Sequence, residues 1–201
     1  NILVLSQLGV ETGSALADIL LGKQNPSGKL TTTWSAWEDY CSIGDFGGKA
    51  DTHYTEGIYV GYRYFDTTGR AVKYPFGYGL TYGDVYAASA EAKKTEAGAS
   101  IRVTVRNDGS TDTQDVIQVY CQNAGSEDAP RNPRLCAFKR VCVPAGESVT
   151  VELAIPEERF LVVNEAGERV MQGDIVLYAG VGQPDALTER LTGHKAIACT
   201  L

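Results

Sequence analysis

The residues from 83 onward form short apolar alternations separated by turn residues, and this pattern constrains the fold more than any other feature. Within Ser100–Arg106, the residues Ile101, Val103 and Val105 would all lie on one face of an extended strand. Asn107–Gly109 then favours a hairpin or another tight turn. A series of about seven short strands predicts a β-sandwich for residues 83–201. The expected strands are 84–94, 100–106, 115–121, 135–143, 148–155, 170–181 and 194–201.

The beginning of the chain has a different pattern, typical of an α/β domain. Asn1–Leu5 is a continuous apolar run, as in a strand that is buried on both faces of a parallel sheet. Residues 11–21 predict a helix that Thr12 or Ser14 caps and Gly22 ends. Because a parallel strand needs parallel neighbours, we expect the chain to begin inside a mostly parallel α/β sandwich whose other strands lie upstream.

The stretch between these two parts is rich in glycine and aromatic residues. Residues 35–53 predict a long loop, and the aromatic run Tyr54–Asp66 predicts a strand pair or a bent strand. Pro75–Tyr82 reads as a connector punctuated by glycine. We therefore expect two domains, an α/β segment with its linker at 1–82 and the β-sandwich at 83–201.

Charge and cysteine content exclude several classes of function. A net charge of −7 argues against nucleic-acid binding, and no apolar run approaches the roughly 20 residues of a membrane span. The five cysteines are odd in number and form no CxxC pair, which argues against a zinc site or a disulfide scaffold. We expect no metal, no cofactor and a reducing, cytoplasmic location.

Four ordered blocks of the sequence resemble glycoside hydrolase family 3. The blocks similar to the end of its α/β sandwich domain are residues 9–22, 25–30, 54–66 and 74–82. The rest is similar to the fibronectin type III-like module of many β-glucosidases, with marks at 105–109, 115–120, 133–139 and 144–147. The resemblance implies an α/β fragment followed by an immunoglobulin/fibronectin type III-like sandwich, cut from a bacterial β-glucosidase-type enzyme.

The resemblance also implies what the chain lacks. Family members hydrolyse glycosides with retention, using an aspartate nucleophile on a (β/α)8 barrel and a glutamate acid/base on a loop of the α/β sandwich. No segment here matches either motif, so we expect no catalytic residue and no activity from this chain alone. Its partners would be the barrel and the upstream α/β sandwich of the parent, which would bind a β-glucoside or oligosaccharide.

Two residues are candidates for contact with that substrate. Glu11 opens a helix at the carboxyl edge of the expected parallel strand, where ligands of α/β domains gather. The alternative for Glu11 is a helix-terminal carboxylate that the helix dipole favours. Trp37, in the glycine-rich loop, could form a wall of a sugar subsite.

Other polar and aromatic residues have structural alternatives. Glu56 and Arg63 predict an ion pair with each other or with Asp66, and contact with sugar is the second interpretation. The tyrosines of the aromatic run would fill a sheet face or, alternatively, stack on sugar.

The lone histidines and a set of aspartates are expected to be structural. His53 and His194 read as surface or capping residues. Asp108, Asp112 and Asp115 lack the order of calcium ligands in an EF-hand and read as turn residues.

Two other functions remain open from the sequence. The β-sandwich could bind carbohydrate or cell wall, which requires exposed aromatic residues on one of its faces. Alternatively, the chain could be a structural or oligomerisation module, a homodimer that pairs through the exposed edge of its incomplete sheet.

Overall fold

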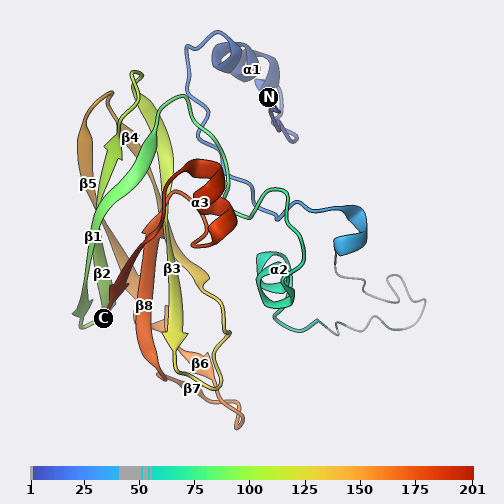
Figure 1. Cartoon of the computed structure of the whole chain (residues 1–201), viewed down its shortest axis with the longest axis vertical. Coiled ribbons are helices and arrows are strands. Elements are labelled where there is room, and N and C mark those ends of the chain that lie inside the picture. Colours follow the sequence, from blue (N-terminus) through green and yellow to red (C-terminus); the bar gives the residue numbers. More distant parts are fainter. Residues whose placement is uncertain (1, 41–50, 52–53, 55) are drawn as a thin grey trace.

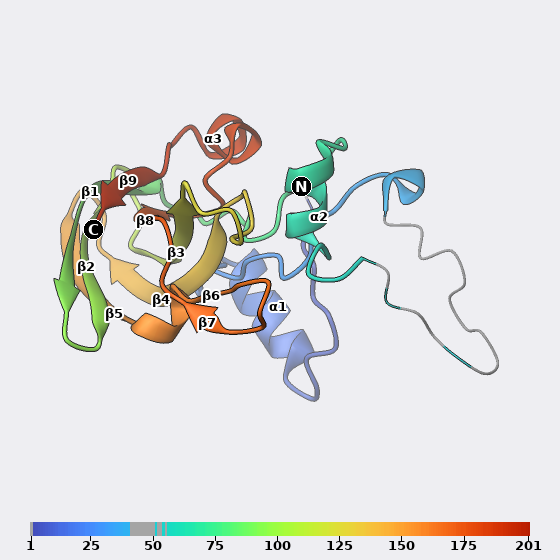
Figure 2. The same ribbon diagram turned by 90° about the horizontal axis from the view of Figure 1, so that it is seen from below.

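The computed structural model describes residues 2–40, 51, 54 and 56–201 (Figure 1). Two antiparallel sheets pack face to face and form a β-sandwich, and the described residues before 85 lie along one side of it (Figures 1 and 2). One sheet has the order β1-β2-β5, with β1 at Val85–Thr95, β2 at Gly98–Asn107 and β5 at Ser148–Pro156. The other has the order β4-β3-β8-β9, with β4 at Arg134–Val143, β3 at Thr113–Ala124, β8 at Asp174–Gly180 and β9 at Ile197–Thr200.

The sandwich core forms where the alternation of the sequence predicts it. Ile101, Val103 and Val105 of β2 are fully buried and face Ile117 and Val119 of β3 across the sandwich core. Burying each such aliphatic side chain stabilises the fold by roughly 1.5–3 kcal/mol. The predicted β-sandwich is thus confirmed, and most of its strands agree with the expected ones. The expected strand 170–181 is divided into β7 (Arg169–Val170) and β8 (Asp174–Gly180), which belong to different sheets.

At Asn107 the chain crosses from one sheet to the other and forms no hairpin, because β2 pairs with β1 and β5 while β3 belongs to the other sheet. The Asn107 side chain is fully buried at this crossover. Its amide nitrogen donates to the carbonyls of Thr111 and Val143, at 2.9 and 3.1 Å, and its oxygen accepts from the backbone N–H of Asp84 and Gly109. This side chain therefore satisfies the backbone groups that the crossover leaves without a ladder partner.

Short elements complete the part after residue 156. They are the 3-10 turn η2 at Glu157–Arg159, the small hairpin of β6 (Val162–Val163) and β7 (Arg169–Val170), and helix α3 at Ala186–Thr192. Helix α3 lies where no helix was expected from the sequence. Asp185 caps it by accepting from the backbone N–H of Thr188 at 2.9 Å, and Gly193 ends it at φ +78°.

The beginning of the chain departs from the expected strand. Residues 2–9 form no strand, and Ile2, Leu3 and Val4 are 73%, 45% and 54% exposed. A parallel strand gains its hydrogen bonds only from neighbouring strands, and the described residues supply none here.

Helix α1, Thr12–Leu20, follows as predicted, and Gly22 ends it at φ +71°. The predicted cap was wrong. The Thr12 hydroxyl donates to the Gly9 carbonyl at 2.6 Å, and no side chain caps the helix.

The aromatic run is the clearest correction to the expected fold. In place of a strand pair, Tyr62–Thr68 forms helix α2, which begins after Gly61 at φ +56° and ends at Gly69 at φ +66°. The side chains of the helix pack on different neighbours. Phe65 is buried against Tyr40, and other side chains of α2 contact the sandwich. Tertiary packing has overridden the β-propensity of tyrosine and phenylalanine.

Candidate functional site

The two candidate substrate-contact residues lie in separate places. Glu11 is exposed at the start of α1, whereas Trp37 begins the 3-10 turn η1 (Trp37–Asp39). The two elements are apart in both views of the chain (Figures 1 and 2). Among the described residues, Glu11 forms no ion pair.

Trp37 is 90% exposed, yet the backbone around it is well held. The Tyr40 hydroxyl donates to the Thr33 carbonyl at 3.0 Å and accepts from the Ser35 N–H at 3.2 Å. The Ser35 hydroxyl in turn donates to the carbonyl of Ala71. An exposed indole on a fixed turn is an available flat apolar surface with one N–H donor.

Helix α2 is fastened to the sandwich at three points. Tyr62 stacks on Phe76 with ring centroids 4.8 Å apart, and its hydroxyl accepts from the backbone N–H of Leu135 at 3.1 Å. One turn further, the Gln183 side-chain amide donates to both carboxylate oxygens of Asp66, at 2.8 and 2.7 Å. Asn132 and Thr67 add a third contact at 3.2 Å.

The Asp66 carboxyl has an unusual environment. Burial raises the pKa of Asp66 from 3.8 to about 6, the Gln183 hydrogen bonds oppose that rise, and the nearby Asp185 carboxylate adds to it. Gln183 itself is 4% exposed, and its side-chain oxygen has no partner among the described residues. Burial therefore makes ionisation of Asp66 costly, and the Gln183 hydrogen bonds offset part of that cost.

A buried polar network joins the connector to the middle of the sandwich. The hydroxyl of Tyr120, a fully buried residue, donates to the Gln118 oxygen at 2.8 Å. The Gln118 amide donates to the carbonyls of Gly77 and Val181, at 2.8 and 3.1 Å. Gly77 sits at φ +77°, and a Cβ there would lie 2.2 Å from the Gln118 oxygen, so only glycine fits.

An ion pair made by Lys29 is a second link between the part of the chain before the sandwich and the sandwich itself. Lys29 Nζ lies 2.7 Å from Asp115 Oδ1, and their side chains are only 10% and 3% exposed. The same ammonium donates to the Gly79 carbonyl at 2.7 Å. Burial raises the pKa of Asp115, and Lys29 opposes that rise.

The remaining candidate aspartates and His194 each have a structural partner. Asp108 pairs with Arg106 at 2.6 Å, Asp112 accepts from the Ala145 N–H, and Asp115 binds Lys29, so these three carboxylates have separate partners. His194 stacks on Tyr86 and lies 2.7 Å from Asp84.

The predicted ion pair of Glu56 is wrong within the described part of the chain. Arg63 lies over the Tyr62 ring, and Asp66 binds Gln183. Within the described ranges, Tyr62 and Tyr64 lie on helix α2 and not on a strand, so the expected sheet face of tyrosines is wrong. His53 and Cys41 lie outside the described residues, and the other four cysteines are free thiols.

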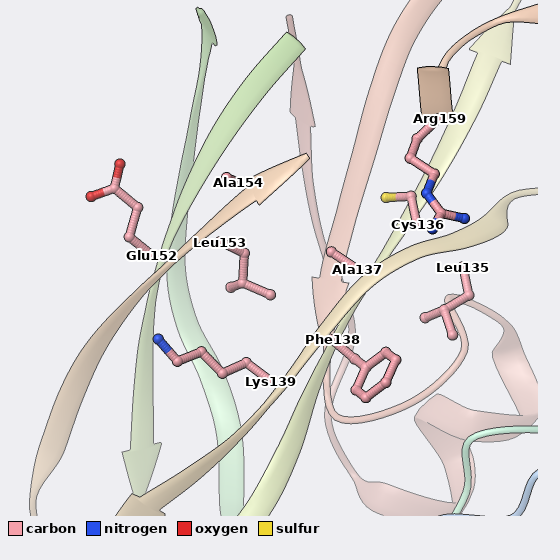
Figure 3. Close-up of a pocket in the computed structure, with 9 residues that line it drawn as sticks. All are labelled: Leu135, Cys136, Ala137, Phe138, Lys139, Glu152, Leu153, Ala154 and Arg159. Carbon is pink, nitrogen blue, oxygen red and sulfur yellow. The ribbon is translucent and has the colours of Figure 1, made fainter. Parts of the chain in front are cut away.

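A groove of about 360 Å³ opens between the edge strands β4 and β5 (Figure 3). Cys136 and Arg159 lie together at one end, and Glu152 points away from them (Figure 3). Glu152 accepts from the Ser100 hydroxyl, a hydrogen bond that lowers the pKa of Glu152. Because the retaining mechanism needs two carboxylates about 5–5.5 Å apart, this groove with its single carboxylate does not provide that chemistry.

A hollow of about 430 Å³ lies beside α3 and holds two carboxylates, Asp185 and Glu189. Asp185 is committed to capping α3 through the N–H and hydroxyl of Thr188. In the described part of the chain, neither cavity presents a free pair of carboxylates.

Sequence comparison identifies the family. Residues 1–82 match the glycosyl hydrolase family 3 C-terminal domain, and residues 115–182 match a fibronectin type III-like domain. The chain is 34% identical to an exo-alpha-(1->6)-L-arabinopyranosidase of Bifidobacterium longum, over 89% of this chain and 24% of that protein. It is 44% identical to beta-glucosidase A of Butyrivibrio fibrisolvens, over 84% of this chain and 23% of that protein.

Solved structures agree with this result. Beta-glucosidase 3B of Thermotoga neapolitana, solved in complex with glucose, is 32% identical with a TM-score of 0.78, covering 95% of this chain and 26% of that one. A family 3 beta-glucosidase of Bifidobacterium adolescentis is 32% identical with a TM-score of 0.80, covering 94% of this chain and 28% of that one. The chain thus spans about a quarter of the length of these relatives. It belongs to glycoside hydrolase family 3, as part of the C-terminal domain of that family followed by its fibronectin type III-like sandwich.

Proposed function

We propose that this chain is a non-catalytic portion of a retaining β-glucosidase-type enzyme and that it completes and braces the catalytic domains. The distribution of exposed apolar side chains carries this proposal. Among the described residues, fifteen large hydrophobic side chains are exposed before residue 83 and three after it. Such a concentration marks a surface that packs against other protein.

Two proposals accompany this one. We place the domain division between 82 and 83, supported by the family match that ends at 82 and by β1, which begins at Val85.

We also place Trp37 and Glu11 on the side of the chain that faces the substrate of the parent. The exposure of both side chains supports this placement.

The location of the parent protein remains a proposal. We propose a cytoplasmic protein of bacterial origin, on the strength of the bacterial relatives, although fungal relatives match as well. In the described ranges, no helix is long and apolar enough to cross a membrane.

The test of the main proposal compares the chain alone with the chain joined to the rest of its parent. An aryl β-glucoside should be hydrolysed by the full-length enzyme and left intact by residues 1–201. Replacing Trp37 with alanine in the full-length enzyme should raise KM. Turnover by the isolated chain that Glu11→Gln abolishes would refute the assignment.

The binding-module alternative receives less support. Among the described residues of the sandwich strands, a single large aromatic side chain is exposed: Phe138 on β4, with 68% of its surface accessible. One ring is a small platform for sugar stacking. Retention of residues 83–201 on a glucan resin, lost in Phe138→Ala, would favour this alternative.

Under the homodimer alternative, two copies of the chain would associate through the apolar residues 2–5. We expect any self-association of the isolated chain to depend on this segment, because three of its residues are exposed and apolar. Replacing Leu3 and Leu5 with lysine would then yield a monomer in sedimentation equilibrium. A dimer that survives this double substitution would contradict the role of the segment.

A further inference from the structure

Helix α2 lies between the sandwich and the turn that carries Trp37 (Figures 1 and 2). On its sandwich side, Asp66 accepts two hydrogen bonds from Gln183, a residue 117 positions away. Tyr62 adds an edge-to-face contact with the buried ring of Tyr120, at 6.4 Å between centroids. The sandwich therefore fixes both the position and the rotation of this short helix.

On its other side, α2 holds η1. The ring of Phe65 meets Tyr40 edge to face with centroids 5.6 Å apart. Just beyond the helix, Arg70 lies 3.8 Å from Asp39 and donates to the Glu38 carbonyl at 3.4 Å. These contacts hold Glu38, Asp39 and Tyr40, the three residues that follow Trp37.

The two sets of contacts form one continuous path. Gln183 lies in the loop between β8 and α3, which the rigid sandwich supports. The turn η1 has two backbone hydrogen bonds of its own, from the Asp39 N–H to the Ala36 carbonyl and from the Tyr40 N–H to the Trp37 carbonyl. A single turn of this kind is short and weakly bonded, so its position depends on what it packs against. Moving α2 would therefore move Trp37.

We propose that Asp66 and Gln183 are positioning residues through which the fibronectin type III-like sandwich sets the place of the Trp37 ring. This inference rests on the proposed function, in which Trp37 lies against a sugar ring of the substrate. It assigns the sandwich a specific role in substrate binding beyond general bracing. It also predicts that substitutions remote from the catalytic carboxylates change the affinity for the sugar.

The first experiment uses the 201-residue chain and needs no activity. Trp34→Phe leaves Trp37 as the single indole, and its fluorescence anisotropy and acrylamide quenching report how firmly it is held. Gln183→Ala should lower the anisotropy and speed hydrogen exchange in α2. Asp66→Asn keeps one acceptor for the Gln183 amide and should preserve most of the wild-type signal.

A matched control is Gln122→Ala. Gln122 lies on β3 of the same sandwich and bonds to Tyr178 and to the Arg131 carbonyl, away from α2. This variant should leave the Trp37 signal unchanged, with circular dichroism showing that all variants are folded. If Gln122→Ala and Gln183→Ala change the signal equally, or if neither does, the positioning role is refuted.

The second experiment uses the full-length enzyme. Gln183→Ala should raise KM for an aryl β-glucoside about three- to tenfold, as expected for weakening one aromatic stacking contact, with kcat nearly unchanged. The effect should vanish in a Trp37→Ala background. If Gln183→Ala leaves KM unchanged in an active enzyme, the positioning role is refuted and the proposed function stands. If the full-length protein has no glycosidase activity, the proposed function is refuted, and the fluorescence result alone decides the positioning role.

Discussion

The ionisation of Asp66 should make the stability of this chain depend on pH in a predictable direction. Burial raises its pKa in the folded chain to about 6, against an ordinary value of 3.8. The folded state then binds more protons than the unfolded state between these two values. Stability from this group is fully present below about pH 4 and is lost as the pH rises through 6.

The size of the effect follows from the same numbers. The difference between 3.8 and about 6 corresponds to at most about 3 kcal/mol. Because the carboxyl is only partly buried and water screens it, we expect about 1 kcal/mol. The groups that interact with it are Gln183 and Asp185 from the β8–α3 loop and Tyr120 from β3.

Urea unfolding of the wild type and Asp66→Asn, between pH 3.5 and 7.5, measures this difference. Subtracting the two free energies of unfolding cancels the other titrating groups, including Asp115, whose pKa is also raised. Relative to the variant, the wild type should lose about 1 kcal/mol of stability as the pH rises. A difference that stays constant, or that changes in the opposite direction, would refute the reasoning.

Three further substitutions test the junction between the two parts of the chain, each by urea unfolding at pH 7. Lys29→Met leaves the Asp115 carboxylate buried without its cation and should destabilise the chain by about 3–5 kcal/mol, an effect that Asp115→Leu in the same chain should largely reverse. Tyr120→Phe removes the donor to the Gln118 oxygen and should cost about 1–3 kcal/mol, so a neutral result would contradict the network. Gly77→Ala should destabilise by at least as much, since its Cβ would collide with Gln118 at a positive φ, and a neutral outcome would show that the connector adjusts freely.

Strand alternation in the sequence was sufficient to predict the β-sandwich, because each strand buries one face in a shared core. Ile101, Val103 and Val105 show this directly, since all three are fully buried. The helix α3 was missed although its signals are present. Asp185 is a favourable cap and Gly193 a favourable end, but the helix has only seven residues and no long apolar period.

The beginning of the chain was misread because its structure depends on contacts that local sequence does not encode. Residues 2–5 have the composition of a buried strand, yet a strand forms only where neighbours supply hydrogen bonds. The Tyr62–Phe65 run favours a strand by propensity, but packing against Tyr40, Phe76 and Tyr120 makes it a helix.

The candidate site was predictable only in part. Trp37 was recognisable as an aromatic residue in a polar, glycine-rich loop. The contact that holds α2 in place was not, because Asp66 and Gln183 are 117 residues apart and neither has a local motif. Such a pair becomes visible only when the fold brings the two elements together.

The most direct test of the central claim is reconstitution of activity. Residues 1–201 are expressed apart from the rest of the parent enzyme, and each piece and their mixture are assayed with an aryl β-glucoside. We expect no turnover from this chain and recovery of turnover when the two pieces associate, because the proposed role of this chain is to complete and brace the catalytic domains. Hydrolysis by residues 1–201 alone, or full activity of the remainder without them, would contradict the account.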